Sequence, residues 1–494
     1  MYSRNKGGNH GEPIAITVIG AGFSGTLLSL HLLRHCPPGT HIRLIERNRQ
    51  FGPGQAYATD NPNHLLNVPA GRMSAFPDQP RHFLDWLHSR PMHEMDGVMP
   101  DGGSFVPRRL FGRYIRQQLH DALRRQSSVH LELLHGSVAS ITQEPRNLRL
   151  HIEDGHDIAT DIAVLALGNF TPEPIPVADS MFYDPALYCA DPWSPRAFAG
   201  LHPTAPVLLI GAGLTMVDAV ISLLDQGHVG PIHAVSRRGL LPRCHTSAVA
   251  TPRGPIAYPS GLHALTRFLR EESEQALATG GTWQGVIDGL RPVTQEIWAT
   301  LSADDRQCFL RHLRTWWDVH RHRIAAPVMA RIEAARTSGQ LCVHAGRLRG
   351  YESAGGRMTV RFRPRGSDDI ASLRVARVVN CSGPATDYRR VVDPLVRSLL
   401  IEGTGRPDPS RLGLDVSERC ALRSRSGVES RRLFAVGPVT KGAFWEMTAV
   451  PDIRQQCEQL AQGLALCWLR HRGRAHESAW RTRLAERMRA MPTC

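Results

Sequence analysis

The sequence has no continuous apolar run near the ~20 residues that a membrane-spanning helix needs. Residues 1–13 are polar and rich in glycine, and the apolar run over residues 14–19 is too short for the core of a signal peptide. The ten cysteines are scattered, and no pair has the close spacing of a redox dithiol or a zinc site. These absences predict a cytoplasmic protein without membrane contact, in which most cysteines are small buried hydrophobic residues.

Lysine is almost missing as well, because Lys6 and Lys441 are the only two and arginine carries nearly all of the positive charge. The formal net charge is +14, from 59 basic and 45 acidic residues. Clustered basic residues can follow a phosphate backbone, but here they are spread along the chain and do not alternate with aromatic residues. We therefore expect no nucleic-acid partner, and we assign the excess charge to acidic cofactors or substrates.

A chain of 494 residues is too long for a single core, so two or three domains are expected. A unit of strand, glycine turn and helix occurs twice. The first unit has a strand at 14–19, a turn at 20–25, a helix at 26–34 and a second strand at 41–45 that ends at Glu46. The second unit has a strand at 207–210, a turn at 211–215, a helix at 216–224 and a strand at 232–235, followed by Arg237 and Arg238.

The remaining chain adds strands and one long helical stretch. Apolar, β-branched segments predict strands at 131–138, 148–152, 158–167, 343–348, 358–363, 374–380 and 431–436. Residues 260–335 have apolar positions three and four apart, which predicts helices, and a further helix is expected at 452–469. The proline-rich segment 172–206 is expected to be an extended connection between domains.

The first glycine turn has the spacing and the context of a dinucleotide-binding fingerprint. Gly20 permits the tight turn, Gly22 lets the backbone approach a pyrophosphate, and Gly25 lets helix and strand pack closely. The helix N-terminus offers free N–H groups to the anion, and the carboxylate of Glu46 can accept hydrogen bonds from the ribose hydroxyls. We expect FAD here, because an N-terminal unit of this kind usually holds it; a glycine turn without a ligand is the alternative.

The second glycine turn is less complete. Gly211 and Gly213 are present, but Met216 stands at the position of the third glycine. The strand that follows ends at Arg237 and Arg238 instead of an acid, and guanidinium groups suit a 2′-phosphate. We therefore expect NADPH rather than NADH at this turn, with a vestigial site as the alternative.

Other motifs exclude several classes of enzyme. The turn at residues 22–26 lacks the second glycine of a hydrolase nucleophile elbow, and no Walker A lysine turn occurs. His312, His320 and His322 lie in an arginine-rich helical stretch, with the last two on different helix faces, so no metal site is expected.

Several longer stretches carry a resemblance to a known family. They are Gly54–Tyr57, His64–Ser74, Pro107–Tyr114, Gly211–Asp218, Ser236–Arg243 and Trp445–Arg454. Together they resemble the bacterial FAD/NAD(P)-binding proteins with two Rossmann-type domains. That family is related to class B flavin monooxygenases and to N-hydroxylating enzymes, including ones that oxidise the amine of aspartate to a nitro group.

The resemblance implies an α/β fold with two Rossmann-like dinucleotide-binding domains. The FAD domain is expected at 1–200 and 381–494, and the inserted NADPH domain at 201–380, including the helical segment at about 260–335. The turns and the resemblance together predict cofactor contacts at Gly20, Gly22, Phe23, Ser24, Gly25, Glu46, Arg47, Tyr57, Asn67, Met73, Gly168, Gly211, Gly213, Leu214, Thr215, Ser236, Arg237, Arg238, Gly437, Thr448, Ala449 and Val450.

This sequence departs from related flavoproteins in three ways. Gly437-Pro438 stands where many two-domain flavoproteins have Gly-Asp to hold the ribityl chain, so those contacts stay unassigned. The linker lacks the histidine-containing fingerprint of Baeyer–Villiger enzymes, and no Cys-x4-Cys pair follows the first helix, which argues against disulfide reductase chemistry.

The resemblance implies an NADPH-dependent flavin monooxygenase that forms a C4a-hydroperoxide from oxygen and N-hydroxylates a small amino acid or amine, with an aspartate-type substrate as the sharper expectation. Lys441, which follows Gly437-Pro438, is a candidate for binding a substrate carboxylate, with a solvated surface lysine as the alternative. Arg291 and Arg72 are further candidates, with ordinary surface ion pairs as the alternative. Two other functions stay open: a flavin reductase without oxygen insertion, and a non-catalytic flavin-binding sensor.

Overall fold

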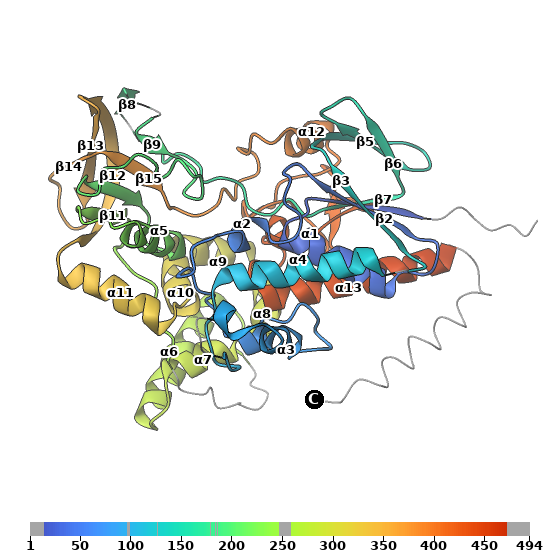
Figure 1. Cartoon of the computed structure of the whole chain (residues 1–494), viewed down its shortest axis with the longest axis horizontal. Coiled ribbons are helices and arrows are strands. Elements are labelled where there is room, and N and C mark those ends of the chain that lie inside the picture. Colours follow the sequence, from blue (N-terminus) through green and yellow to red (C-terminus); the bar gives the residue numbers. More distant parts are fainter. Residues whose placement is uncertain are drawn as a thin grey trace, which may run out of the picture.

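The computed structural model describes residues 14–95, 99–125, 127–177, 179–182, 184, 186–246 and 258–471. Two sheets lie side by side, each with helices packed on it (Figure 1). The first has the strand order β16-β17-β7-β1-β2-β3, and its pairs are parallel except for β16 with β17. Its strands are β1 (Ala15–Ile19), β2 (His41–Glu46), β3 (His130–His135), β7 (Ile162–Leu165), β16 (Ala421–Arg423) and β17 (Glu429–Ala435).

Strand β1 is central to the first sheet because its sequence AITVI is apolar on both faces, and four of its five residues are buried. Helices α1, α4 and α13 pack on the sheet and on one another, in front of it in Figure 1. The helices of this part are α1 (Phe23–His35), α2 (Gly54–Tyr57), η1 (Ala70–Arg72), α3 (His82–His88), η2 (Met92–Met95), α4 (Arg108–Arg124), α12 (Pro394–Glu402), η5 (Gly437–Thr440) and α13 (Val450–His471).

A small antiparallel sheet, β4-β5-β6, connects β3 to β7. Its strands are β4 (Val138–Gln143), β5 (Leu148–Ile152) and β6 (Asp157–Thr160). Its apolar face is closed by α12, because Leu395, Val396 and Leu399 share a buried cluster with Ile141 and Leu150.

The second large sheet has the order β14-β13-β12-β11-β10-β15-β9, and β8 pairs with β12. The pairs of β10 with β11 and β15, and of β11 with β12, are parallel, as a Rossmann-like unit requires. The strands are β8 (Asp179–Phe182), β9 (Tyr188–Cys189), β10 (Val207–Ile210), β11 (Ile232–Ser236), β12 (Leu341–Ala354), β13 (Arg357–Pro364), β14 (Ala371–Val375) and β15 (Arg377–Asn380). Helices α5 (Leu214–Asp225) and α11 (Ala326–Thr337) cover it through a shared buried cluster.

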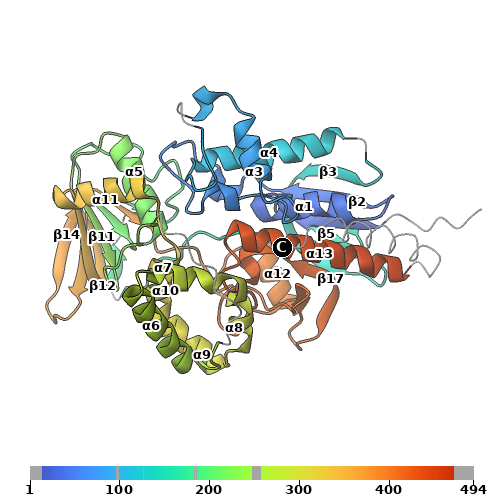
Figure 2. The same ribbon diagram turned by 90° about the horizontal axis from the view of Figure 1, so that it is seen from below.

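A layer of short helices borders both large sheets (Figure 2). It consists of α6 (Leu262–Ala278), α7 (Trp283–Gly289), η3 (Arg291–Val293), α8 (Thr294–Thr300), α9 (Ala303–Cys308), η4 (Phe309–Leu313) and α10 (Arg314–Arg321). Leu262, Trp298 and Leu301 of this helical layer share a buried cluster with Leu412 and Trp445, which belong to the part of the chain that carries the first sheet. The layer is therefore packed against the segment that precedes α13.

The expected fold class, two Rossmann-like α/β units with a helical insertion, is confirmed. Several element predictions were wrong in detail. The segment 131–138 ends one strand and begins another, and the predicted strands 158–167 and 374–380 are each split in two. The proline-rich segment 172–206 is more than a connection between domains, because β8 and β9 within it pair with strands of the second sheet.

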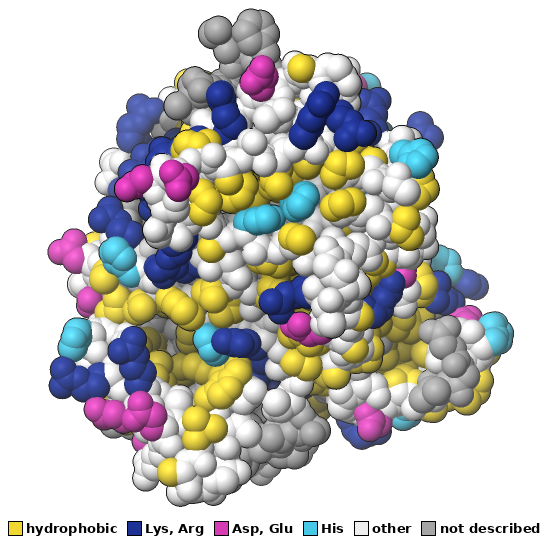
Figure 3. Space-filling view, turned by 90° about the vertical axis from the view of Figure 1, so that its left-hand side faces the viewer, with side chains coloured by type: hydrophobic (Ala, Val, Ile, Leu, Met, Phe, Trp, Pro, Cys, Tyr) yellow, Lys and Arg dark blue, Asp and Glu magenta, His cyan; other side chains and the backbone are white. Residues whose placement is uncertain are grey.

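The surface agrees with the even spread of charge in the sequence. Figure 3 shows basic side chains distributed over the face nearest the second sheet, with acidic and apolar side chains between them. In the part of the chain that the structure describes, no helix is both long enough and apolar enough to cross a membrane.

Candidate functional site

The first glycine turn is tightly packed at two of its glycines and open at the third. Gly20 has φ +100°, and a Cβ atom there would lie 2.5 Å from the carbonyl oxygen of Ala166. A Cβ atom on Gly25 would lie 1.9 Å from the carbonyl oxygen of Gly20, whereas one on Gly22 would meet nothing closer than 3.5 Å. Two glycines are thus required by the protein's own packing, and Gly22 leaves space beside the helix.

Helix α1 begins directly at this turn with Phe23 and Ser24. It has no side-chain cap and no acidic residue in its first turn. Its free N–H groups and the positive end of its dipole are therefore left for an anionic ligand.

Glu46 lies at the end of β2 and is only 8% exposed. Its Oε2 accepts a hydrogen bond from Ala21 N at 2.7 Å, and its Oε1 accepts one from Asn48 N at 2.9 Å. Each oxygen keeps a further lone pair, so the carboxylate can still accept hydrogen bonds from the ribose hydroxyls. The neighbouring Arg47 is directed elsewhere, because its Nη1 pairs with Asp393 Oδ2 at 3.0 Å.

The end of β17 returns the chain to the same place. Gly437 has φ +77°, and a Cβ atom there would lie 2.4 Å from Ser24 Oγ. Thr448, which is exposed, and Ala449 precede α13, which starts at Val450. The structure therefore brings Gly437 next to the start of α1.

The remaining residues predicted to contact FAD are more dispersed. Tyr57 packs edge-on against Phe23, with ring centroids 5.5 Å apart. Met73 is buried in the core, and Gly168 has φ +68° with no atom within 4 Å of its Cβ direction. Asn67 faces the second unit, because its carbonyl oxygen accepts a hydrogen bond from His245 Nε2 at 3.0 Å.

The second glycine turn has a similar shape. Gly211 has φ +113°, and a Cβ atom there would lie 2.4 Å from the carbonyl oxygen of Cys381, whereas one on Gly213 would meet nothing within 4 Å. Leu214 and Thr215 open α5 without a side-chain cap or an acid in the first turn. Met216 is fully buried in the core of the second unit, so it replaces the third glycine without closing the turn.

An arginine-lined cavity of about 600 Å³ lies beyond the end of β11. The sequence predicted Arg237 and Arg238 here, and Ser236 Oγ just before them accepts a hydrogen bond from Gly239 N at 3.0 Å. The fold adds four arginines that were not predicted from the sequence: Arg311, Arg347, Arg363 and Arg365. Asp368, which also lines the cavity, pairs with Arg363 at 3.4 Å and is fully exposed. The cavity therefore keeps a strong excess of positive charge.

Two of the three substrate-binding candidates lie where the helical layer meets the segment before α13. Lys441 Nζ lies 5.0 Å from the ring centroid of Trp445, and burial together with nearby Arg314 lowers the pKa of Lys441 to about 8. Arg291 Nη2 pairs with Asp452 Oδ2 at 3.0 Å, and burial lowers the pKa of Arg291 and raises that of Asp452. Arg72 is exposed at the end of η1.

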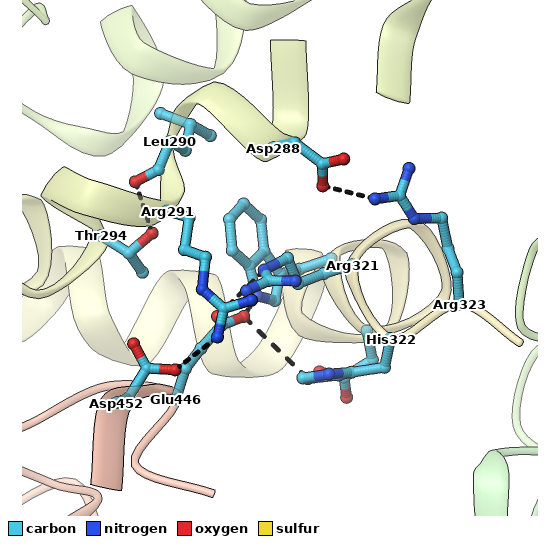
Figure 4. A network of polar contacts seen from close by, with 11 residues as sticks. Asp288, Leu290, Arg291, Thr294, Arg321, His322, Arg323, Glu446 and Asp452 are labelled. Carbon is cyan, nitrogen blue, oxygen red and sulfur yellow. Dashed lines mark hydrogen bonds and ion pairs between the residues drawn. The ribbon is translucent and has the colours of Figure 1, made fainter. Parts of the chain in front are cut away.

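Glu446 anchors this junction (Figure 4). It is 4% exposed, and its φ of +64° lies in the left-handed region that side chains other than glycine rarely adopt. Its carboxylate accepts hydrogen bonds from Trp317 Nε1 at 2.7 Å and from Arg321 Nε at 3.0 Å. His322 lies beside it, and burial lowers the pKa of His322 to about 4, so this ring is neutral at pH 7. Glu446 lies in one of the stretches that carry the family resemblance, but no role was predicted for it from the sequence.

The helical layer encloses a second cavity of about 600 Å³, and this one is apolar. Its wall includes leucines and six large aromatic residues: Trp283, Trp298, Phe309, Trp316, Trp317 and Trp445. Arg270 and Glu274 are the charged residues among those that line it. Trp445 therefore belongs both to this apolar cavity and to the neighbourhood of Lys441.

Motif residues from both units meet between them. Arg108, at the start of α4, donates to both carboxylate oxygens of Asp218 on α5, at 2.7 and 3.1 Å. His64 Nε2 lies 3.0 Å from the carbonyl oxygen of Asp218 and 2.9 Å from Ser222 Oγ. The stretches that carried the family resemblance thus hold the two sheets in one relative orientation.

Comparison with known proteins agrees with this architecture. Residues 17–170 match the family described as FAD-NAD(P)-binding, and no curated protein sequence matches the chain. Ornithine N-hydroxylase of Kutzneria sp. 744, solved with reduced FAD, NADP+ and L-ornithine, is 14% identical with a TM-score of 0.63, over 92% of this chain and 99% of that one.

Two further solved structures share the fold. L-lysine 6-monooxygenase of Pseudomonas syringae is 16% identical with a TM-score of 0.60, over 91% of this chain and 98% of that one. The cadaverine monooxygenase of Erwinia amylovora, solved with FAD, is 14% identical with a TM-score of 0.59, over 91% and 93%. The likeness to these three structures covers 91–92% of the chain.

Proposed function

We propose that the chain, whose residues 17–170 match the FAD-NAD(P)-binding family, is an FAD- and NADPH-dependent monooxygenase that N-hydroxylates a small amine or amino acid. The observation that carries the proposal is that an ornithine N-hydroxylase, a lysine monooxygenase and a cadaverine monooxygenase share the fold of 91–92% of this chain. The two glycine turns, which are open beside their helices, agree with it. The predicted division into an FAD domain (1–200 and 381–494) and an NADPH domain (201–380) is part of this proposal, except that β8 and β9, which pair with the second sheet, belong with the NADPH domain.

Each residue group has a task in this function. Gly20, Gly22 and Gly25 cradle the FAD pyrophosphate at the start of α1, and Glu46 accepts the ribose hydroxyls. Gly211 and Gly213 receive the NADPH pyrophosphate, and Arg237 and Arg238 bind its 2′-phosphate. The bound flavin supplies the transfer of electrons to oxygen and of oxygen to the amine. The protein orients the amine and excludes water.

An acidic amino acid of the aspartate type is the first substrate candidate. Lys441 supports it, because its ammonium has no ion-pair partner within 4 Å among the described residues and lies over the Trp445 ring. Arg291 is the second candidate for a carboxylate, and to bind one it would have to share its guanidinium with Asp452.

The apolar cavity favours a second class of substrate, an amine with an apolar body. Six large aromatic side chains line the cavity, and Trp445 connects it to the surroundings of Lys441. Burying an apolar group there is favourable by about 25 cal/mol per Å². A short acidic amino acid would leave this cavity unused.

The amine is identified by product formation. Purified FAD-loaded enzyme with NADPH is offered L-aspartate, L-ornithine, phenethylamine and hexylamine, and hydroxylamine product is measured against NADPH consumed. A product from aspartate alone supports the acidic candidate, and a product from the two apolar amines supports the second. NADPH oxidation without any N-oxygenated product would instead point to a flavin reductase, and no oxidation to a flavin-binding sensor.

The NADPH site has its own test, the double variant Arg237→Ala, Arg238→Ala. Losing two charge-assisted hydrogen bonds should raise the KM for NADPH by about 10- to 100-fold and leave FAD content and the KM for NADH unchanged. Arg357→Ala, an exposed arginine at the far end of β13 and outside the cavity, is the matched control. An unchanged KM for NADPH in the double variant would refute this site.

A further inference from the structure

Three metal-ligating side chains meet where α1 and α13 pack together, away from both glycine turns. His31 and His35 lie one helical turn apart on α1, and Glu458 lies on α13. One ligand atom from each side chain lies within 4.8 Å of the other two. His35 Nε2 lies 3.7 Å from Glu458 Oε1, and the two imidazole rings are nearly parallel, at an angle of 10°.

The hydrogen bonds leave one imidazole nitrogen on each histidine without a partner. His31 is fully buried, and its Nε2 lies 3.3 Å from the carbonyl oxygen of Ala75. A donated Nε2–H fixes the tautomer, so that Nδ1 keeps its lone pair. Buried His31 Nδ1 and buried His35 Nε2 have no hydrogen-bond partner. Buried polar atoms in proteins are nearly always paired, so both nitrogens call for a ligand.

We propose that His31, His35 and Glu458 form a binding site for one divalent transition-metal ion of the zinc class. Two imidazoles and one carboxylate are ligands that zinc prefers, and three protein ligands leave a fourth position for water. Ligand atoms around a tetrahedral zinc ion lie about 3.4 Å apart, so small side-chain rotations suffice to close the site. The bond from His31 to Ala75 is the outer-shell contact that usually orients a metal-bound histidine.

The surroundings permit both a cation and its entry. The side chains of His35 and Glu458 are 12% and 14% exposed, which gives an ion a path from solvent. Two arginines oppose a cation: Arg34, which is neutralised by Asp78, and Arg454, which donates to the carbonyl oxygen of Ser74.

The site would tie together two helices that both begin at the proposed FAD site. Helix α1 starts at the pyrophosphate turn, and α13 starts just after Thr448 and Ala449. A metal bound only in the folded protein raises stability by mass action. We therefore expect a structural ion that holds α1 against α13, and no part for it in oxygen transfer.

The test measures zinc on the full-length, FAD-loaded protein after dialysis against a chelator and back-titration with ZnCl2. We expect one zinc ion per chain by elemental analysis. We also expect zinc to raise Tm by a few degrees. Glu458→Gln and His35→Ala should each weaken zinc binding by at least about tenfold. His156→Ala, which removes an 83% exposed histidine beside Asp154, is the control and should leave zinc binding unchanged.

Binding that is absent, or equally strong in Glu458→Gln and His35→Ala, overturns the proposal. If those variants lose FAD or fold poorly in chelator, the wild-type protein is titrated with Co²⁺ in place of zinc and its visible absorption is recorded. Visible absorption bands of one tetrahedral or five-coordinate cobalt ion per chain support the site. A spectrum identical to that of cobalt in buffer overturns it.

Discussion

At the scale of single residues, the glycines of the first turn differ in what they face. A Cβ atom on Gly25 would meet the Gly20 carbonyl oxygen at 1.9 Å, whereas one on Gly22 would stay 3.5 Å from the nearest protein atom. Gly25→Ala should therefore destabilise the protein even without FAD, by about 2 kcal/mol or more. Gly22→Ala should keep the stability of the FAD-free protein and lose FAD affinity.

Urea unfolding of the FAD-free variants and fluorescence titration with FAD separate the two effects. Gly213→Ala extends the comparison to the second turn, where it should spare both stability and FAD and weaken NADPH alone. If Gly22→Ala and Gly25→Ala lose the same amount of stability, Gly22 is needed for the packing of the protein itself, and its role in admitting the ligand is refuted.

Lys441 has a pH dependence of its own, because burial lowers its pKa to about 8. If its ammonium binds a substrate carboxylate, the KM for that substrate should be flat below pH 8 and rise about tenfold per pH unit above it, as the proton is lost. Lys441→Met should raise KM at pH 7 and abolish this dependence, whereas Lys441→Arg should keep a low KM at pH 9.

The same shift has a consequence for stability. The folded protein holds the Lys441 proton less tightly than the unfolded chain, so between pH 8 and the ordinary lysine pKa near 10.5 the unfolded chain binds more protons. The contribution of Lys441 to the free energy of unfolding therefore increases with pH across this window and is constant below it. If the free energy of unfolding depends on pH in the same way in wild type and in Lys441→Met, the lowered pKa of Lys441 is contradicted.

The sequence predicted the glycine turns, Glu46 and the pair Arg237 and Arg238, because each of these motifs is formed by residues that are close in sequence. They could not give Arg347 and Arg363, which meet only as cross-strand partners of β12 and β13. In the same way, the spacing of His31 and His35 is visible in the sequence, although the predicted helix ended at residue 34, but Glu458 lies more than 400 residues away.

At the scale of elements, the contact between α10 and the segment before α13 rests on Glu446. Glu446→Ala would leave the guanidinium of Arg321, which is 10% exposed, buried without its partner. We expect a loss of about 3 kcal/mol in the free energy of unfolding, as for other broken buried ion pairs. The double variant with Arg321→Ala should cost less than the sum of the single variants.

Chemical denaturation measures these values. Glu333→Ala, which removes an exposed pair with Arg336 on α11, is the control and should change stability by less than about 0.5 kcal/mol. Additive effects of Glu446→Ala and Arg321→Ala would contradict the coupling of the helical layer to α13.

Periodicity located the elements better than their ends or partners. Strands β1 and β10 were found because both of their faces are buried. Strand β17 was found from the apolar residues at its C-terminal end, since its first residues are exposed or half-buried. Helices α3 and α4 went unnoticed. The split between β6 and β7 was missed because only Thr160 and Asp161 separate the apolar residues of the two strands. The positive φ of Glu446 has no sequence signature, since it is held by Trp317 and Arg321 from a distant helix.

At the scale of the whole molecule, the pair between Arg108 and Asp218 fixes one sheet relative to the other. Arg108→Ala should keep FAD and NADPH affinity but slow the reduction of FAD at saturating NADPH by about tenfold, because hydride transfer depends on how the two cofactors are placed. Anaerobic stopped-flow absorbance of the flavin measures the rate. The exchange Arg108→Asp, Asp218→Arg should restore part of it, and an unchanged rate in Arg108→Ala would remove the pair from this role.

The central claim is that the chain moves an oxygen atom from O2 to an amine at the expense of NADPH. The most direct measurement runs the reaction under ¹⁸O2 with the best amine of the panel and examines the product by mass spectrometry. The account predicts one ¹⁸O atom in each hydroxylated amine and close to one product molecule per NADPH oxidised. Product without the label, or NADPH oxidation that yields only labelled peroxide or water, would contradict it.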